Sequence, residues 1–385
     1  MSVAVVAGPV ANKPRNGGNA WVPYAYVSGL RRLGFDAFLL EQLDTSTCID
    51  ARGAPARFRD STNLAYFAEV ARCLGEPGHS VVICGRDAWG VSPETVPDVL
   101  AEADLLFNIS GHLTGWLRDL PGRSAYIDLD PGYTQFWNTA GVVHGSRLDG
   151  HDVYFTVGQN VGQSECAIPT CGLEWRPALP PSTVEEPPEA LGDPGRFTTV
   201  GSWRGSFGRI EAGGTTYGLK AHEFRRFAGL PRDVPGVIFE VALDIDPADH
   251  KDRRALEENG WRLIDPLAVA GEPAAYRHYI RNSWAEFSAA QGIYVETKSG
   301  WFSDRSVRYL ASGKPVLVQD TGFGRTLPVG EGLLAFRTLD EAAAGVREIE
   351  RDYDGHAKAA RALAEEYFDS DRILGRMLEE VGVSP

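Results

Sequence analysis

The chain has 385 residues, of which 43% are hydrophobic and 23% charged, so it can build real cores and is not a disordered tail. A net charge of −14 argues against binding to nucleic acid or to anionic membranes, because a protein binds either of them through a basic face. Five cysteines without a CxxC pair indicate reduced thiols in a cytoplasmic protein. No apolar run approaches the roughly 18 residues of a membrane helix.

The first half of the sequence alternates between strand and helix patterns. Strands are expected at residues 2–8, 36–40, 80–84, 105–109, 125–129 and 153–157, with helices near 22–33, 64–74 and 95–103 between them. Strands that are apolar on both faces belong to parallel sheets covered by helices. Residues 1–171 are therefore predicted to form a Rossmann-like α/β domain.

A proline-rich stretch and a second α/β pattern follow. Residues 172–195 contain six prolines and no apolar period, which predicts a linker. Strands are then expected at 197–201, 237–242, 261–264, 293–295, 315–319 and 333–336, and helices at 220–229, 273–282, 303–312, 339–351, 355–368 and 371–381. Residues 196–365 should form a second Rossmann-like domain, and residues 366–385 a C-terminal helix that crosses back to the first.

The segment from Lys298 to Gly324 carries the most informative site pattern. Gly300 precedes Ser303, a favourable N-cap, and Asp304 opens the helix that follows. Free N–H groups at a helix start favour an anion, and Arg305 and Arg308 are placed to add charge-assisted hydrogen bonds to phosphate. The alternative is an ordinary capped helix between two strands.

The residues Ala311-Ser-Gly-Lys-Pro-Val-Leu-Val318, after a glycine-led loop and a helix, resemble the donor-binding segment of GT-B glycosyltransferases. The resemblance implies two Rossmann-like domains facing across a cleft, the acceptor on the first and the nucleotide sugar on the second, with the diphosphate at Ser303. Many members carry a ribose-binding glutamate where this chain has Arg308. A dTDP-sugar, which needs no 2′-hydroxyl contact, is therefore one expectation, and UDP or GDP held through Asp304 is the other.

Two further segments are assigned to the donor by this resemblance. Arg204 and Lys220 follow the first strand of the second half and would neutralise the leaving diphosphate. Asp320 and Thr321, in the loop after a later strand, would contact the donor sugar. The alternative for Lys220 is a solvated lysine at a helix start.

In the first half, polar residues follow the strands at the edge where ligands bind in open α/β sheets. The Gly17-Gly18 loop would let a sugar or phosphate approach the backbone, or is simply a tight turn. His112 is the candidate general base, with Asp128 and Asp130 as alternative bases or as groups that orient it. Asp128 and Asp130 also match a DxD metal motif, but that pattern recurs at three other places, so no metal is assigned.

The sequence therefore predicts a metal-independent, hexosyltransferase-type glycosyltransferase. It would move a sugar from a dTDP- or UDP-sugar to a hydroxyl or amine of a small-molecule acceptor, without a further cofactor. One alternative is a nucleotide-sugar epimerase of the same fold, which would need paired carboxylates in the cleft. Another is a non-catalytic protein that clamps a ligand by hinge closure. Whether the chain forms a homodimer stays open.

Overall fold

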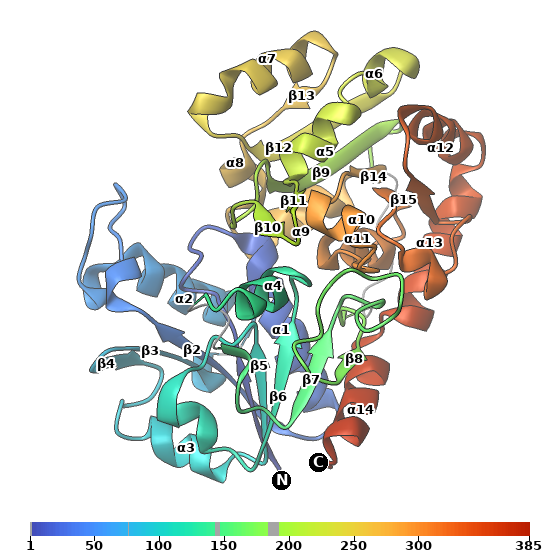
Figure 1. The fold of residues 1–385 in the computed structure, drawn as a ribbon. Helices are drawn as coiled ribbons and strands as arrows, with labels where there is room; N and C mark the ends of the chain where they lie inside the picture. Colours follow the sequence, from blue (N-terminus) through green and yellow to red (C-terminus); the bar gives the residue numbers. More distant parts are fainter. Residues whose placement is uncertain (1, 76, 143–146, 184–191) are drawn as a thin grey trace.

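Two sheets, one in each half of the chain, organise the computed structural model, which describes residues 2–75, 77–142, 147–183 and 192–385 (Figure 1). The first sheet has the strand order β4-β3-β2-β1-β5-β6-β7-β8. Its strands are β1 (Val3–Ala7), β2 (Asp36–Leu43), β3 (Ser80–Cys84), β4 (Asp87–Trp89), β5 (Leu105–Ile109), β6 (Arg123–Asp128), β7 (Val153–Thr156) and β8 (Trp175–Pro177). Every pairing is parallel except that of β3 with β4. The order reverses between β1 and β5, as in Rossmann-like domains.

The second sheet has the order β13-β12-β9-β14-β15-β16, with all pairings parallel. Its strands are β9 (Arg196–Ser202), β12 (Ile238–Asp244), β13 (Arg262–Leu263), β14 (Ala285–Ser288), β15 (Val316–Gln319) and β16 (Leu333–Phe336). A small hairpin of β10 (Ile210–Ala212) and β11 (Thr215–Tyr217) follows β9 in the chain. The predicted class, two Rossmann-like α/β halves, is confirmed.

Helices cover both sheets. In the first domain they are α1 (Gly17–Arg32), α2 (Thr62–Cys73), α3 (Val96–Glu102) and α4 (Tyr133–Thr139). The second half contains α5 (Lys220–Arg226), α6 (Leu230–Asp233), α7 (His250–Glu258), α8 (Pro266–Ala270), α9 (Pro273–Arg281), α10 (Gly292–Glu296), α11 (Asp304–Ala311), α12 (Leu339–Arg351), α13 (Tyr353–Tyr367) and α14 (Ser370–Val381). Short 3₁₀ turns lie at Thr45–Thr47, Phe58–Asp60, Pro77–His79, Gly115–Asp119, Pro247–Asp249 and Phe323–Arg325.

Two predicted elements differ from the structure. The strand expected at 293–295 is part of α10, and the neighbouring strand of this sheet is β14. The buried Glu286 interrupts the apolar run of β14, so periodicity alone did not mark it. Within the predicted linker, Trp175–Pro177 form β8, which pairs with β7 and extends the first sheet.

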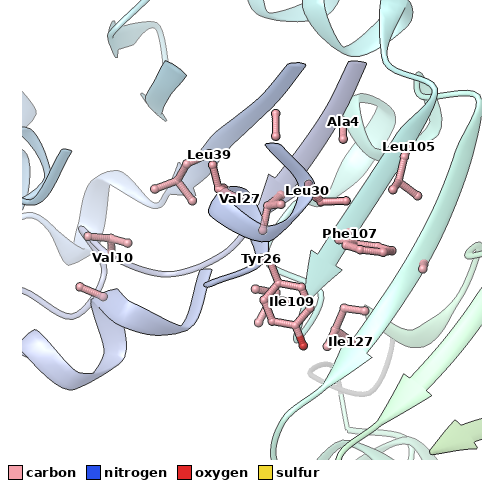
Figure 2. Close-up of a cluster of buried hydrophobic side chains, with 14 of the residues drawn as sticks. Ala4, Val10, Tyr26, Val27, Leu30, Leu39, Leu105, Phe107, Ile109 and Ile127 are labelled. Atoms are coloured by element: carbon pink, nitrogen blue, oxygen red, sulfur yellow. The ribbon is translucent and has the colours of Figure 1, made fainter. Parts of the chain in front are cut away.

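The core of the first domain lies between α1 and the central strands (Figure 2). Tyr26 and Leu30 of α1 pack with Leu39, Phe107 and Ile109 from the sheet, and all are buried. Their spacing along α1 places them on one helical face.

The C-terminal helix α14 completes this core from the far end of the chain. Leu374, Met377 and Leu378 of α14 belong to the same buried cluster as α1. Gly29 of α1 leaves the room that the side chain of Leu374 needs. The expected crossing of the C-terminal helix to the first domain is therefore confirmed, and Figure 1 shows it running beside α1.

Candidate functional site

The carboxyl ends of β9, β14 and β15 meet the starts of α5 and α11 at one edge of the second sheet. Ser303 caps α11, since its Oγ accepts a hydrogen bond from the N–H of Arg305 (3.2 Å). Gly201, near the end of β9, lies beside two cations: a Cβ placed there would be 3.1 Å from Lys220 Nζ and 3.7 Å from an Arg305 nitrogen. The edge therefore combines a helix N-terminus with concentrated positive charge.

Lys220 is the cation of this edge that has no protein partner. Its side chain is only 9% exposed, and within the described residues its Nζ makes no hydrogen bond or ion pair. Burial and the nearby guanidinium of Arg305 lower the pKa of Lys220 to about 7. The charges of Glu286 and Asp304 oppose this shift, but no carboxylate of the described residues forms an ion pair with the buried ammonium, so an anionic ligand would stabilise it.

Arg305, in contrast, is fully engaged by the protein. Its guanidinium donates to Glu286 Oε1 (2.6 Å), Val200 O (2.9 Å) and Ser288 Oγ (2.5 Å). These contacts use three of its five N–H donors and fix it beneath the strand ends. The expected contact between Arg305 and a diphosphate stays a prediction.

Arg308 and Asp304 face the first domain. An Arg308 nitrogen donates to Trp21 O (2.9 Å), and its guanidinium lies 5.0 Å from the centre of the Trp21 ring. Asp304 is half-buried and lines a small cavity of about 30 Å³ with Tyr26. Asp304 also acts on the cationic edge described above, since its charge opposes the lowering of the Lys220 pKa.

Asp320 and Thr321 border a larger cavity of about 500 Å³. Asp320 accepts from Gly322 N (2.8 Å) and from the guanidinium of Arg337 (2.7 Å). The carbonyl of Thr321 accepts from Gly300 N (2.8 Å), which ties the two predicted loops together. Charged and polar residues, among them Arg226 and Lys298, also line this cavity and could hydrogen-bond to a sugar.

A loop of the first domain covers Gly300, and sequence reasoning missed it. The Asn160 side chain donates to Lys298 O (2.9 Å), and its backbone N–H donates to Ser299 O (3.0 Å). A Cβ at Gly300, whose φ is +73°, would lie 2.9 Å from Asn160. Only the apposition of the domains reveals this contact.

Gly18 also serves the domain interface. Glu272 and Pro273 fill the space in front of Gly17, and the ring of Tyr276 lies 3.0 Å from a Cβ placed at Gly18. The backbone at Gly17 and Gly18 is therefore closely approached, as expected, but by residues at and beside α9 of the second domain.

Arg204 is exposed and paired. Its Nε donates to Asp249 Oδ2 (2.7 Å), and the two groups form an ion pair. Of the four basic residues predicted to contact the diphosphate, Lys220 is the one whose side chain makes no hydrogen bond or ion pair within the described residues.

The three candidate bases follow β5 and β6. Burial and the charges of Arg147 and Lys13 lower the pKa of His112 to about 3, so its imidazole is neutral at physiological pH. Asp130 is half-buried and accepts a hydrogen bond from the Tyr294 hydroxyl of the second domain (2.7 Å).

Asp128 is an internal hydrogen-bond acceptor. It is buried and accepts from Gln135 Nε2 (2.8 Å) and Thr156 Oγ1 (2.7 Å). Burial raises its pKa to about 6. These bonds hold the Asp128 carboxylate within the first domain, whereas Asp130 contacts Tyr294 of the second domain.

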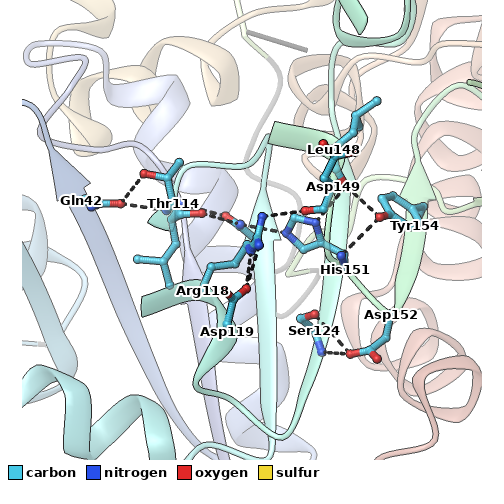
Figure 3. Close-up of polar contacts among 12 residues, drawn as sticks. Gln42, Thr114, Arg118, Asp119, Ser124, Leu148, Asp149, His151, Asp152 and Tyr154 are labelled. Atoms are coloured by element: carbon cyan, nitrogen blue, oxygen red, sulfur yellow. Dashed lines mark hydrogen bonds and ion pairs between the residues drawn. The ribbon is translucent and has the colours of Figure 1, made fainter. Parts of the chain in front are cut away.

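A second histidine, which sequence reasoning did not consider, supports the loop of His112 (Figure 3). His151 is buried, with Nδ1 3.2 Å from Leu148 O and Nε2 3.0 Å from Asn108 Nδ2. These partners fix a neutral ring with its proton on Nδ1, and burial lowers its pKa. The Asn108 side chain also bonds the N–H and carbonyl of Leu113, so the network holds the turn that carries His112.

No protein-family model and no curated protein matches the sequence. Solved structures do match over the whole chain. An alpha-glucosyltransferase in complex with UDP-glucose and DNA containing an abasic site is 10% identical, with a TM-score of 0.61 and 100% of each chain covered. Anabaena HepE in complex with UDP-glucose is 13% identical, with a TM-score of 0.60 and coverage of 98% of this chain and 99% of that one.

Sucrose-phosphate synthase from Thermosynechococcus elongatus is 13% identical, with a TM-score of 0.52 and 99% of both chains covered. The chain has the GT-B fold. At these identities the likeness concerns the fold, which agrees with the resemblance seen around Ser303.

Two features are absent from the described residues: a candidate metal-binding cluster and a membrane-spanning helix. No group of three or more His, Cys, Asp or Glu side chains there is arranged to hold a metal ion. Over the same ranges no helix is both long and apolar enough to cross a bilayer.

Proposed function

We propose that this protein is a glycosyltransferase that moves a sugar from a nucleoside diphosphate donor to a hydroxyl or amine of a small-molecule acceptor. The observation that carries the proposal is the buried, unpartnered ammonium of Lys220 at the edge where α11 begins. Structures of the same fold contain UDP or UDP-glucose, which supports an anionic nucleotide as the ligand of that edge.

In this proposal Lys220 and the N-terminus of α11 hold the diphosphate. Negative charge grows on the diphosphate as the glycosidic bond breaks, and a preorganised cation in a dry site stabilises that charge. Because the pKa of free Lys220 is about 7, a bound diphosphate would raise that pKa and keep the amine charged. The helix start and the lysine would supply this stabilisation without a metal ion.

The acceptor is proposed to meet the donor from the side of the first domain. His112 is the proposed general base of an inverting reaction; its imidazole is neutral, and the bound substrates must raise its low pKa for it to hold the proton of an acceptor hydroxyl. Asp130 is the alternative base, with the Tyr294 hydroxyl holding its carboxylate. The cavity beside Asp320 and Thr321 would receive the sugar.

The test is nucleotide binding followed by turnover. Calorimetric titration with UDP, dTDP and GDP should show binding of at least one, and Lys220→Met should weaken it about a hundredfold or more. Lys251→Met, on the exposed face of α7, is the matched control and should bind like the wild type. Binding by none of the three nucleotides would contradict the proposal.

The turnover assay separates the alternatives. Transfer or slow hydrolysis of the matching sugar nucleotide would support a transferase. Isomerisation of that donor without an acceptor would instead indicate the epimerase, and binding without turnover would indicate a non-catalytic ligand-binding protein.

A further inference from the structure

A separate cavity of about 260 Å³ lies between the helices of the two domains. Its walls come from α1 of the first domain and from α9, α11 and α13 of the second. It uses the second half of α11, at Ala311 and Ser312, whereas the proposed donor site uses the start of that helix. The cavity is therefore distinct from the strand ends where Lys220 lies.

This cavity concentrates positive charge in an otherwise acidic protein. Five arginines line it: Arg32, Arg277, Arg281, Arg308 and Arg361. Among the described residues that line it, none is an aspartate or glutamate. Arg32 also pairs with Asp371 and Arg361 with Glu365, and Arg277 and Arg281 have interactions of their own, so the inference does not depend on free arginines.

Two residues that line the cavity each carry a buried polar atom without a hydrogen-bond partner among the described residues: Ser182 Oγ and Arg308 Nε. Ser182 is 1% exposed, and its backbone is held by bonds to Phe368 and Ser370. Buried polar groups are rarely left unpaired, and two of them on the lining residues of one cavity point to a ligand that supplies acceptors. A guanidinium and a hydroxyl are both donors, so that ligand carries acceptor oxygens.

We propose that this cavity binds a small tetrahedral oxyanion, a phosphate group above all, alone or on a small metabolite. Its oxygens would accept from Arg308 Nε and Ser182 Oγ within the field of the other arginines, whose planar donors suit phosphate. Because the walls belong to both domains, a bound anion would bridge them and stabilise their arrangement. The site goes beyond the proposed sugar transfer and does not require it.

The experiment titrates inorganic phosphate, and separately sulfate, into the full-length protein at constant ionic strength, by calorimetry and thermal unfolding. We expect saturable binding and a rise in Tm with phosphate. Ser182→Ala removes a hydroxyl that has no protein partner, so it should preserve the fold and weaken phosphate about tenfold. Arg281→Gln should weaken it by a similar factor, while both variants keep wild-type affinity for the nucleotide.

Lys220→Met distinguishes this cavity from the donor site, because it should lose nucleotide binding and keep phosphate binding. If phosphate affinity fell in Lys220→Met but not in Ser182→Ala or Arg281→Gln, the ion would be bound at the strand ends and the proposal would be overturned. No saturable binding of phosphate up to tens of millimolar would overturn it as well. Sulfate binding with equal affinity would show recognition of the tetrahedral charge, and weaker sulfate binding would show a site selective for phosphate; either supports the proposal.

Discussion

The carboxyl ends of the two sheets differ in how their buried polar groups are satisfied. In the first domain, Glu41 accepts from the backbone N–H groups of Val10 (2.8 Å) and Asn12 (2.7 Å), and Asp128 and His151 are likewise bonded within the domain. In the second domain Lys220 is buried without a partner.

This difference between the two sheets indicates which carboxyl end is the better candidate for binding a ligand. A polar group that the fold already satisfies gains little from a ligand, whereas an unpaired buried charge gains a counter-ion. The carboxyl end of the first sheet holds the loop of His112 through bonds within the domain, and we propose that the carboxyl end of the second sheet binds an anion.

The largest expected effect tests whether the first edge is only a scaffold. We expect His112→Ala to lower kcat about 10²- to 10⁴-fold, because it removes the proposed base, while nucleotide affinity is unchanged. Steady-state kinetics and calorimetry measure the two quantities. Full turnover in this variant would shift the role to Asp130, or indicate a reaction that retains configuration and needs no base.

The stability of Lys220→Met tests, without any substrate, whether the buried ammonium at the carboxyl end of the second sheet lacks a partner. Removing an unpaired buried charge should raise the free energy of unfolding at pH 6 by roughly 1–4 kcal/mol. The gain should shrink as pH rises from about 7 toward 10.5, because the folded wild type loses a proton that the unfolded chain still holds, which stabilises the folded state. Urea unfolding at several pH values measures this, and destabilisation at pH 6 would show that the ammonium has a partner.

A matched substitution at the first edge should have the opposite sign. Asp128→Asn should destabilise the protein by about 2 kcal/mol at pH 7, because Gln135 and Thr156 both donate to Oδ2 while the Asp130 N–H donates to Oδ1, and asparagine has a single acceptor oxygen for these donors. The raised pKa of Asp128, about 6, makes its contribution to wild-type stability decline as pH rises from about 4 to 6. Stability curves for the wild type and variant should differ in that window, and equal stability at pH 7 would refute the structural role.

The pH dependence of turnover sharpens the comparison further. If Lys220 must be charged to capture the donor, kcat/KM should fall about tenfold per pH unit above about 7. Titration of His112 should not change kcat/KM above pH 5, because its pKa of about 3 keeps the imidazole neutral there. Lys220→Arg keeps its charge at all these pH values, so the fall of kcat/KM should shift to higher pH in this variant. An unchanged fall in that variant would assign the titration to another group.

The smallest effect is expected at Arg204. Its guanidinium is exposed and paired with Asp249, and exposed ion pairs contribute about 0–1 kcal/mol. Arg204→Ala should therefore change nucleotide affinity less than about fivefold. A loss as large as that of Lys220→Met would show that Arg204 leaves Asp249 when the donor binds, and would restore the role that the sequence suggested.

Much of the fold was predictable because it depends on local patterns. The apolar runs marked most central strands, and the Ser303 cap and the apolar stripe of α14 predicted both helices and their faces. Strand β14 was not predictable, since its buried Glu286 is tolerated only through Arg305, 19 residues later. Strand β8 was hidden by the prolines around it.

The sequence by itself determined two α/β halves, a helix start after Gly300 and a set of basic residues around it, because periodicity, caps and composition are properties of neighbouring residues. Only the tertiary structure decided which of those cations remains unpaired. Arg305 is neutralised by Glu286, Arg204 by Asp249 and Arg308 is held by Trp21, while the buried ammonium of Lys220 forms no hydrogen bond or ion pair within the described residues. The physical reason is that pairing and desolvation depend on distances between residues that the chain brings together from different strands, helices and domains.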